Sequence, residues 1–213
     1  VRVFEKARGP GGRMSTRWHD GFEFDHGAQY FTVRDEMFQG AVGRWRERGL
    51  VETWRGRVIN ITNGAVRDDH ESVERFVAVP KMNALCRDLS NGLPMTLNTR
   101  VSKITRVGDA WELRSEEGRD LGAFDCVLIT TPPAQVLDIL PVASGLAREI
   151  DAAEMLPCWA LMAVFDQRID VDWDGAFVFE SPLSWVARNR SKPGRPEAEA
   201  WVIHGSPEWS EAH

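Results

Sequence analysis

The sequence predicts an α/β protein with two domains, the second of them rich in strands. Apolar strand-like and helix-like segments follow one another along the first part of the chain, which favours a layered α/β arrangement. The run CVLIT at 126–130 is continuously apolar, as in a strand covered on both faces of a sheet. Further strand-like segments after residue 158 then predict a sheet-rich second domain.

The chain opens with a predicted strand at 1–5, VRVFE, which ends in an acid and leads into an Arg- and Gly-rich turn at 6–13. Residues 35–48 carry apolar side chains at helical spacing and predict an amphipathic helix, with Asp35 as its N-cap and Gly49 just past its end.

Short strands are expected between residues 50 and 76, where the pair Asn63-Gly64 favours a tight hairpin turn. Pro80 is expected to open a second helix that runs to about Ser90, stops at Gly92 and buries a shared face of Met82, Leu85 and Leu89. Three strands should follow, at 96–105, 110–114 and 125–130.

Pro132 and Pro133 are expected to begin a third helix containing Val136, Leu137 and Leu140, and a fourth is expected at 146–153. The predicted strands of the second domain lie at 159–165, 176–179, 184–188 and 200–204.

Composition and charge exclude several classes of protein. The net charge of −6 argues against a nucleic-acid binder, which needs excess Lys and Arg to replace phosphate counterions. No apolar stretch reaches the length of about 18 residues that spans a bilayer. The three cysteines, Cys86, Cys126 and Cys158, are far apart, so we expect no disulfide framework or metal cluster but buried small hydrophobes. We expect a cytoplasmic protein without a membrane or nucleic-acid partner.

The boundaries of the chain also carry an expectation. It begins with Val in what reads as a buried strand, and it stops just after Ser206-Pro207-Glu208, which reads as the cap and first turn of a helix. We therefore expect a chain truncated at both ends.

The segment 3–14, VFEKARGPGGRM, carries the strongest chemical signal. A carboxylate at the end of a strand can accept hydrogen bonds from both hydroxyls of a ribose. Paired glycines let the backbone approach a diphosphate, and an arginine supplies charge to it. The order of acid, basic pair, glycine pair and arginine fits a dinucleotide, although a surface turn rich in Gly and Arg is the plainer alternative.

This segment resembles the second strand and following loop of the flavin amine oxidase family. The resemblance implies FAD as the cofactor and an FAD/NAD(P)-binding Rossmann-like domain beside a mixed-sheet α+β substrate domain. Glu5 would then hold the adenosine ribose. The residues implied near the diphosphate are Arg8, Gly11, Gly12 and Arg13, and Lys6 and Met14 are implied as further cofactor contacts.

The segment 24–32, FDHGAQYFT, follows at the spacing that the same family shows, and it resembles a run in bacterial renalase-like members that passes beside the flavin. Gly27, Ala28, Gln29 and Tyr30 are therefore implied as cofactor contacts. A generic turn with a core tyrosine is the alternative.

Two later strands are implied to return to the cofactor. The first offers Val101 to the adenine, and the second ends in CVLITTPP, whose Thr130 and Pro132 would approach the cofactor. Apolar strands ending in Thr-Pro also occur in many other α/β proteins, so packing alone is the alternative.

The segment 184–195, SWVARNRSKPGR, resembles another renalase-type run. We interpret Trp185 and Trp201 as packing residues. Asn189, Ser191 and Lys192 are interpreted as residues that pin a loop, and 191–197 as a linker-like stretch.

The resemblance divides the chain into parts of the FAD-binding domain at 1–34 and 95–135 and a substrate-binding domain at 35–94 and 136–213. The family's G-x-G-x-x-G motif, expected just ahead of Val1, and its C-terminal G-D motif are not in this sequence.

No hydrolytic motif competes with this interpretation, since H-E-x-x-H, zinc-spaced Cys/His and G-x-S-x-G runs are missing from the sequence. The run 68–71, DDHE, is interpreted as a solvated turn, and no metal is expected. The sequence assigns no catalytic side chain.

The resemblance implies an oxidase that passes hydride from a small molecule to flavin and then to O2, giving H2O2. Renalase-like proteins imply dihydro-NAD(P) isomers as the substrate. The alternatives are a conventional amine oxidase or desaturase-like flavoenzyme, and an incomplete chain without catalytic activity.

Overall fold

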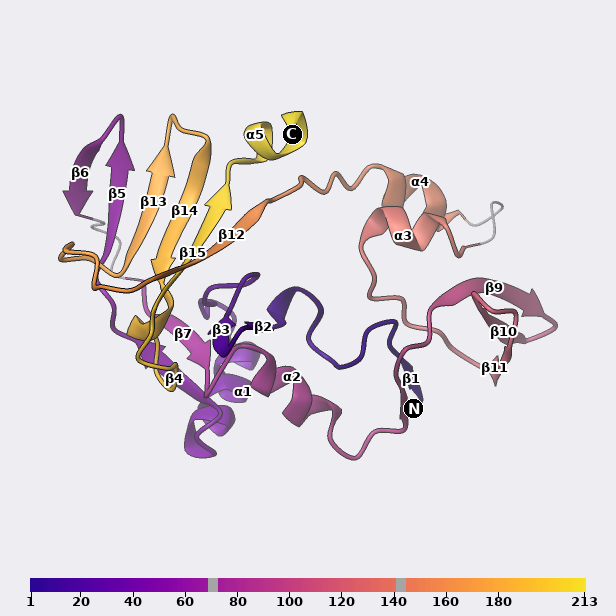
Figure 1. Ribbon diagram of the computed structural model, residues 1–213. Helices are drawn as coiled ribbons and strands as arrows, with labels where there is room; N and C mark the ends of the chain where they lie inside the picture. Colours follow the sequence, from indigo (N-terminus) through magenta and orange to yellow (C-terminus); the bar gives the residue numbers. More distant parts are fainter. Residues whose placement is uncertain (69–72, 141–144) are drawn as a thin grey trace. The chain divides into compact units, whose positions relative to one another are not determined.

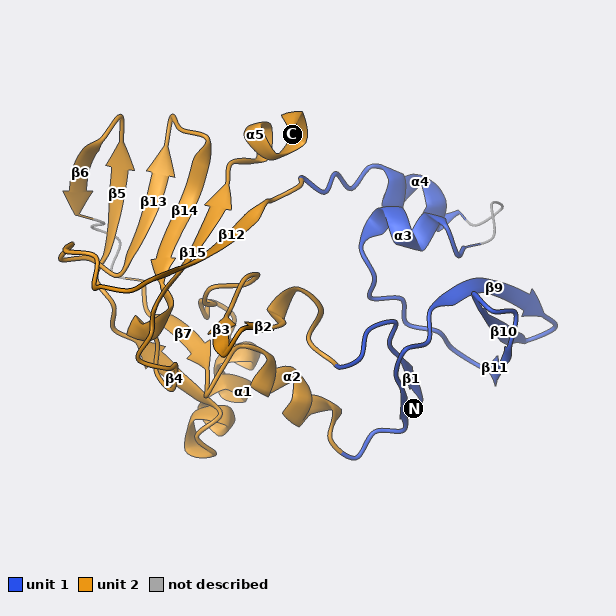
Figure 2. Cartoon of the chain, in the orientation of Figure 1, with its two compact units in different colours: residues 1–9, 92–156 blue, residues 10–91, 157–213 orange. Residues whose placement is uncertain are grey.

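The computed structural model describes residues 1–68, 73–140 and 145–213 (Figure 1). The chain folds into two compact units, each built from two stretches of sequence (Figure 2). Unit 1 comprises residues 1–9 and 92–156, and unit 2 comprises residues 10–91 and 157–213. Residues 10–34 thus pack in the same unit as the strands of the second domain. The assignment of cofactor-binding and substrate-binding domains stays a prediction.

Unit 1 contains a parallel strand pair and a three-stranded antiparallel sheet. β1 (Val3–Phe4) pairs in parallel with β8 (Met95–Thr96). The sheet has the order β11-β10-β9, from Asp120–Phe124, Ala110–Ser115 and Val101–Val107. The helices α3 (Pro133–Leu137) and α4 (Leu146–Asp151) follow. Ile104, Leu113 and Leu121 form the buried core, against which Phe4 and Val101 pack.

The predicted strand at 125–130 is wrong. The strand of this region is β11, which ends at Phe124, and residues 126–130 run on without regular structure. Leu128 is 88% exposed, so the apolar run is not covered on both faces. Apolar composition favours a strand only where neighbouring strands supply a hydrogen-bonded ladder, and no described strand pairs with these residues.

Unit 2 is built around a six-stranded mixed sheet with the order β12-β15-β14-β13-β5-β6. These strands span Ala160–Phe165, Glu199–Gly205, Leu183–Arg188, Gly175–Phe179, Val58–Thr62 and Ala65–Asp68. The other described strands of the unit form two antiparallel pairs, β2 (Arg17–His19) with β3 (Phe22–Phe24) and β4 (Val51–Trp54) with β7 (Arg75–Ala78) (Figure 1). The strands predicted for the second domain are therefore confirmed with small shifts in their ends.

The helix and turn signals are mostly confirmed. In α1 (Glu36–Glu47) the Asp35 side chain accepts a hydrogen bond from the Phe38 amide at 2.9 Å. Asn63 and Gly64 both have positive φ, as the hairpin between β5 and β6 requires. The second helix, α2 (Asn83–Ser90), starts three residues later than expected.

The apolar face expected for α2 is only partly buried. Leu89 is exposed, so only Met82 and Leu85 of the expected apolar face are buried.

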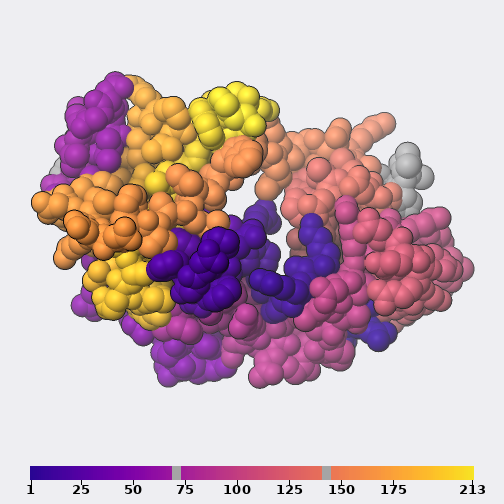
Figure 3. Space-filling view, in the orientation of Figure 1, coloured from indigo at the N-terminus to yellow at the C-terminus, as the bar shows by residue number. Residues whose placement is uncertain are grey.

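The last helix, α5 (Pro207–Ala212), is capped by Ser206. The Ser210 hydroxyl accepts a hydrogen bond from the Trp159 amide at 3.1 Å. This contact fixes α5 beside the start of β12 at the surface (Figure 3, yellow and orange).

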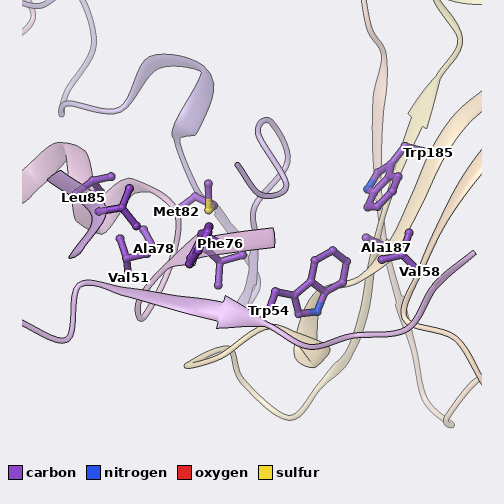
Figure 4. Packing of buried hydrophobic residues seen from close by; sticks show 11 residues of the cluster. Val51, Trp54, Val58, Phe76, Ala78, Met82, Leu85, Trp185 and Ala187 are labelled. Atoms are coloured by element: carbon purple, nitrogen blue, oxygen red, sulfur yellow. The ribbon is translucent and has the colours of Figure 1, made fainter. Parts of the chain in front are cut away.

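The main core of unit 2 gathers residues from β4, β7, α2 and the sheet (Figure 4). Trp54 on β4 and Trp185 on β14 both belong to this core, and their ring centroids lie 6.3 Å apart. Burial of large aromatic side chains of this kind is typically the largest stabilising contribution in a small domain. The prediction that Trp185 and Trp201 are packing residues is confirmed, because both are buried.

The predicted burial of all three cysteines is wrong. Cys86 is half-buried, whereas Cys126 and Cys158 are exposed, and none of the three forms a disulfide. Within the described residues there is no helix that is long and apolar enough to cross a bilayer. Of the run 68–71, residues 69–71 lie outside the described residues, and the described part of the chain gathers no three potential metal ligands.

Candidate cofactor site

Glu5 stands at the end of β1 in unit 1, where the sequence predicts a ribose-binding acid. Its backbone extends the pairing with β8, since its amide donates to Thr96 O at 3.0 Å and its carbonyl accepts from Thr99 N at 2.9 Å. One carboxylate oxygen accepts the Ala7 amide at 2.7 Å. The side chain is half-buried and has no ion pair to another described residue, so its second oxygen stays available.

Five other predicted contacts, Lys6, Arg8, Val101, Thr130 and Pro132, belong to unit 1. The Thr99 amide donates to the Glu5 carbonyl, and Val101, two residues later, begins β9. The predicted adenine contact therefore lies close to the predicted ribose contact. The Lys6 ammonium donates to Gln135 Oε1 at 3.1 Å, which brings Lys6 to the first turn of α3, just after Pro132. Thr130 and Arg8 are exposed.

The glycine-arginine stretch lies in unit 2 and has the open backbone that close approach of a diphosphate requires. Gly11 and Gly12 have φ of +142° and +49°, backbone conformations that residues other than glycine adopt only with strain. A Cβ on Gly12 would meet no atom within 4 Å, so the space beside it is open. Residues 12–14 form a short 3-10 helix, with Arg13 exposed and Met14 half-buried.

The second predicted segment packs directly on the first. The Ala28 amide donates to Arg13 O at 2.9 Å. A Cβ on Gly27 would lie 2.1 Å from the same carbonyl oxygen, so only glycine permits this approach. The predicted contacts Gly11 to Met14 and Gly27 to Tyr30 are therefore brought together within unit 2.

Asp25 anchors this segment through a buried ion pair with Arg195. Its Oδ2 accepts from the Nε and Nη2 atoms of Arg195 at 2.9 and 2.6 Å, and both side chains are 1% exposed. Oδ1 accepts from the Thr16 hydroxyl at 2.7 Å and the Met82 amide at 3.1 Å. Burial by itself would raise the pKa of Asp25, but the charges of Arg195 and Lys192 and these hydrogen bonds outweigh it and lower the pKa.

Gln29 and Lys192 form a second buried contact between the same two segments. The Lys192 ammonium donates to Gln29 Oε1 at 2.8 Å, and the Gln29 amide donates to the Asp25 and Gly27 carbonyls. Burial lowers the pKa of Lys192 to about 7, with Asp25 opposing the shift and Arg195 adding to it. Lysines with such a pKa exchange protons near neutrality, which is why they are common at functional sites.

The loop that carries Lys192 is held rather than free. The Asn189 amide donates to Glu23 O at 3.0 Å, and the Ser191 hydroxyl donates to Arg188 O at 2.7 Å and accepts from Trp54 Nε1 at 3.1 Å. The interpretation of Asn189, Ser191 and Lys192 as loop-pinning residues is confirmed. The interpretation of 191–197 as a linker is wrong, because Lys192 and Arg195 are buried.

Tyr30 points into the aromatic part of the unit 2 core. Its ring centroid lies 6.0 Å from Trp54 and 5.6 Å from Trp185, and the Arg75 guanidinium lies 5.4 Å from it. These contacts make Tyr30 a packing residue in addition to its predicted place beside the flavin.

Sequence reasoning missed the buried acid and arginine that hold the site. Asp25 lies in the segment 24–32 and Arg195 ends the segment 184–195, but the family resemblance implies no role for either residue. Asp25 is the only acid in the segment 24–32, whereas the segment 184–195 holds three arginines, so the sequence alone does not show which of them pairs with Asp25.

A basic cleft of about 920 Å³ lies in unit 2 beside this loop. It is bounded by the end of β4, by the segment before β13 and by the residues that follow β14. Its charged lining comprises Arg46, Glu52, Arg55, Arg168, Asp174, Arg188, Arg190, Lys192, Arg195 and Glu197. Cationic side chains therefore outnumber carboxylates around it.

The chain shares its fold and sequence pattern with flavoenzymes. Residues 1–41 match the family of NAD(P)-binding Rossmann-like domains. Residues 61–209, more than half of the chain, match the family of flavin containing amine oxidoreductases. The chain belongs to this family. The predicted fold class, FAD-binding Rossmann-like with a mixed-sheet second domain, is confirmed, and the cofactor of this flavin amine oxidoreductase is FAD.

Solved structures of similar fold and low sequence identity include those of two proteins described as oxidases and one isomerase. A protein assigned as a protoporphyrinogen oxidase from Exiguobacterium sp. 255-15 is 12% identical, with a TM-score of 0.74, over 96% of this chain and 70% of that one. Wild-type putrescine oxidase bound to putrescine is 12% identical, with a TM-score of 0.68, over 99% and 71%. A fatty acid isomerase from P. acnes is 9% identical, with a TM-score of 0.65, over 96% and 70%.

The residues of this flavin amine oxidoreductase fit the chemistry of FAD in each unit taken separately. Unit 1 offers a half-buried carboxylate with one oxygen available, as ribose hydroxyls require. Unit 2 offers positive-φ glycines with open space and an exposed arginine, as a diphosphate requires.

Proposed function

We propose that this flavoenzyme oxidises dihydro-NAD(P) isomers back to NAD(P)⁺, with O2 as the final electron acceptor. The substrate gives up a hydride, and O2 takes up two electrons and two protons to become H2O2. When bound, FAD supplies the hydride acceptor and the reactivity toward oxygen. In the proposal Glu5 binds the ribose and Val101 the adenine of FAD. Arg8, Gly11, Gly12 and Arg13 approach its diphosphate. The further proposed contacts are Lys6, Met14, Gly27, Ala28, Gln29, Tyr30, Thr130 and Pro132.

One observation carries the choice of this substrate. The segments 24–32 and 184–195, which both resemble renalase-like proteins, are joined to each other by the contacts of Asp25 with Arg195 and of Gln29 with Lys192. Two segments 160 positions apart that share a resemblance and a buried junction support the renalase type. A dihydropyridine is already a strong hydride donor, so this substrate also suits a site in which the sequence assigns no catalytic acid or base.

The protein's role in this reaction is binding and orientation. The buried junction fixes the backbone of 25–29, and Gly27 lets that backbone lie on the carbonyl of Arg13. Groups fixed in this way lose little entropy when substrate and cofactor bind, which is how a rigid site contributes to rate. All three cysteines are free of disulfides, in keeping with the cytoplasm as the proposed compartment.

Oxidation of an amine is the second candidate, because the family and the fold of putrescine oxidase favour it. The basic cleft argues the other way, since a protonated amine would be repelled by its excess of Arg and Lys.

Anaerobic mixing of the purified flavoprotein with each substrate class tests the proposal. Bleaching of the flavin absorbance by 2- or 6-dihydro-NAD(P), and not by putrescine or benzylamine, is the expected result. Bleaching by the amines alone would replace the proposed substrate with the second candidate. A purified protein that cannot be loaded with FAD would identify an incomplete, non-catalytic chain.

A further inference from the structure

The basic cleft of unit 2 has more cationic groups than its own carboxylates can neutralise. Asp174 pairs with Arg188 at 3.4 Å and Glu197 with Arg190 at 2.8 Å. Arg195 is neutralised from behind by Asp25. These contacts account for two of the three acids in the lining and leave Glu52 as the third.

Three arginines, Arg46, Arg55 and Arg168, remain against that one acid. The Arg46 guanidinium lies over the Phe76 ring at 5.6 Å. Lys192 is buried and donates to the neutral Gln29. Arg55 and Arg168 are exposed and form no ion pair or hydrogen bond with any described residue. Like charges gathered in a concave surface raise the local potential and concentrate anions there.

The wall that carries Arg55 is built rigidly. Trp54, next to it, donates its indole N–H to Ser191 at 3.1 Å and lies 5.8 Å from the Lys192 ammonium. On the other side of Arg55, the Gly56 backbone packs directly against the Trp54 indole, because a Cβ on Gly56 would lie 2.4 Å from that ring. The backbone of Arg55 is thus fixed, whereas its side chain is free to meet a ligand.

We propose that this cleft binds the diphosphate group of the dinucleotide substrate, with Arg55 and Arg168 as its two contacting side chains. Guanidinium groups match phosphate oxygens with paired hydrogen bonds, and two such groups suit the two phosphates of a diphosphate. The inference rests on the proposed function for the identity of the substrate. It is separate from the diphosphate of FAD, for which the glycine-arginine stretch at 11–13 is proposed.

Calorimetric titration of the FAD-saturated protein with inorganic pyrophosphate tests the site directly. We expect binding that weakens as salt is added and that weakens by about tenfold or more in the double variant Arg55→Gln/Arg168→Gln. The matched control is Arg67→Gln/Arg87→Gln, which removes the same charge from exposed arginines on β6 and α2 and should bind as the wild type does. Glu52→Gln removes the unpaired acid and should bind several-fold more tightly.

Three results would overturn the inference. Pyrophosphate could fail to bind the FAD-saturated protein, or bind the two double variants equally. It could also bind only protein without FAD and be displaced by FAD, which would give the cleft to the cofactor.

The substrate arm separates this inference from the proposed function. We expect Arg55→Gln/Arg168→Gln to raise the KM for a dihydro-NAD(P) isomer about tenfold or more, while the corresponding dihydronicotinamide riboside, which lacks the diphosphate, reduces the flavin as in the wild type. If dinucleotide and riboside both reduce the flavin and the variant leaves both unchanged, the inference fails and the proposed function stands. If neither reduces it, the proposed function fails, and the inference about the substrate fails with it.

Discussion

The carboxylate of Asp25 and the guanidinium of Arg195 meet through two hydrogen bonds in the interior of unit 2, 170 positions apart in the sequence. This pair joins the segment expected beside the flavin to the loop after β14. A buried charge deprived of its partner is costly, whereas the intact pair contributes less to stability than its geometry suggests.

Removal of one partner should therefore destabilise the protein strongly. We expect Asp25→Ala to lower the free energy of unfolding by about 3–5 kcal/mol, measured by urea denaturation, because Arg195 is left charged and unpaired. Glu197→Gln is the control, since Glu197 is exposed and its partner Arg190 is only half-buried, and it should cost less than about 1 kcal/mol. A loss of that small size for Asp25→Ala would show that the buried pair does not hold the segment.

Gly27→Ala should disturb the junction between the two predicted cofactor segments. The added Cβ would lie 2.1 Å from the Arg13 carbonyl oxygen, so the backbone must shift. We expect a loss of about 1–3 kcal/mol of stability and weaker FAD binding, measured by titrating protein stripped of FAD. Gly43→Ala is the matched control, because a Cβ there meets nothing within 4 Å inside α1. Equal FAD affinity in both variants would contradict the role of this junction.

The low pKa of Lys192 should make stability depend on pH between about 7 and 8.5. The folded protein holds the Lys192 proton with a pKa of about 7, against 10.5 for the exposed side chain. Over this window the unfolded chain binds the proton and the folded chain releases it, so stability rises with pH, by up to about 1.4 kcal/mol per unit.

Lys192→Met should flatten this rise, measured by denaturation at several pH values. The charged neighbours that bear on Lys192 are Asp25, Arg195 and His204. Burial lowers the pKa of His204, so His204 titrates below this pH window. Burial raises the pKa of Cys86, and the loss of stability that this causes comes above the window. An unchanged slope in the variant would mean that Lys192 keeps an ordinary pKa.

Much of the fold could be predicted because local signals and tertiary structure agree. Asp35 caps α1, Asn63-Gly64 turns the hairpin, and the strands of the second domain follow their apolar patterns. The failure at 125–130 shows the limit of such reasoning. Apolar composition is a property of the segment, whereas a strand depends on partners supplied by other parts of the chain.

The candidate site also has features that could be predicted from the sequence and features that could not. The glycines at 11, 12 and 27 could be predicted because positive φ and close backbone approach leave a residue-type signal. The ion pair of Asp25 with Arg195 and the burial of Lys192 could not be predicted, because a charged residue is expected to be exposed until its distant partner is known.

Titration with FAD of protein carrying Glu5→Gln tests the central claim most directly. Glutamine can still accept the Ala7 amide hydrogen bond, so the local fold is kept while the negative charge is lost. We expect FAD to bind about tenfold or more weakly, with the free energy of unfolding unchanged in the absence of FAD. The control is Glu47→Gln at an exposed position of α1, which should bind FAD as the wild type does. Wild-type affinity for FAD in Glu5→Gln would contradict the claim that this carboxylate holds the adenosine ribose.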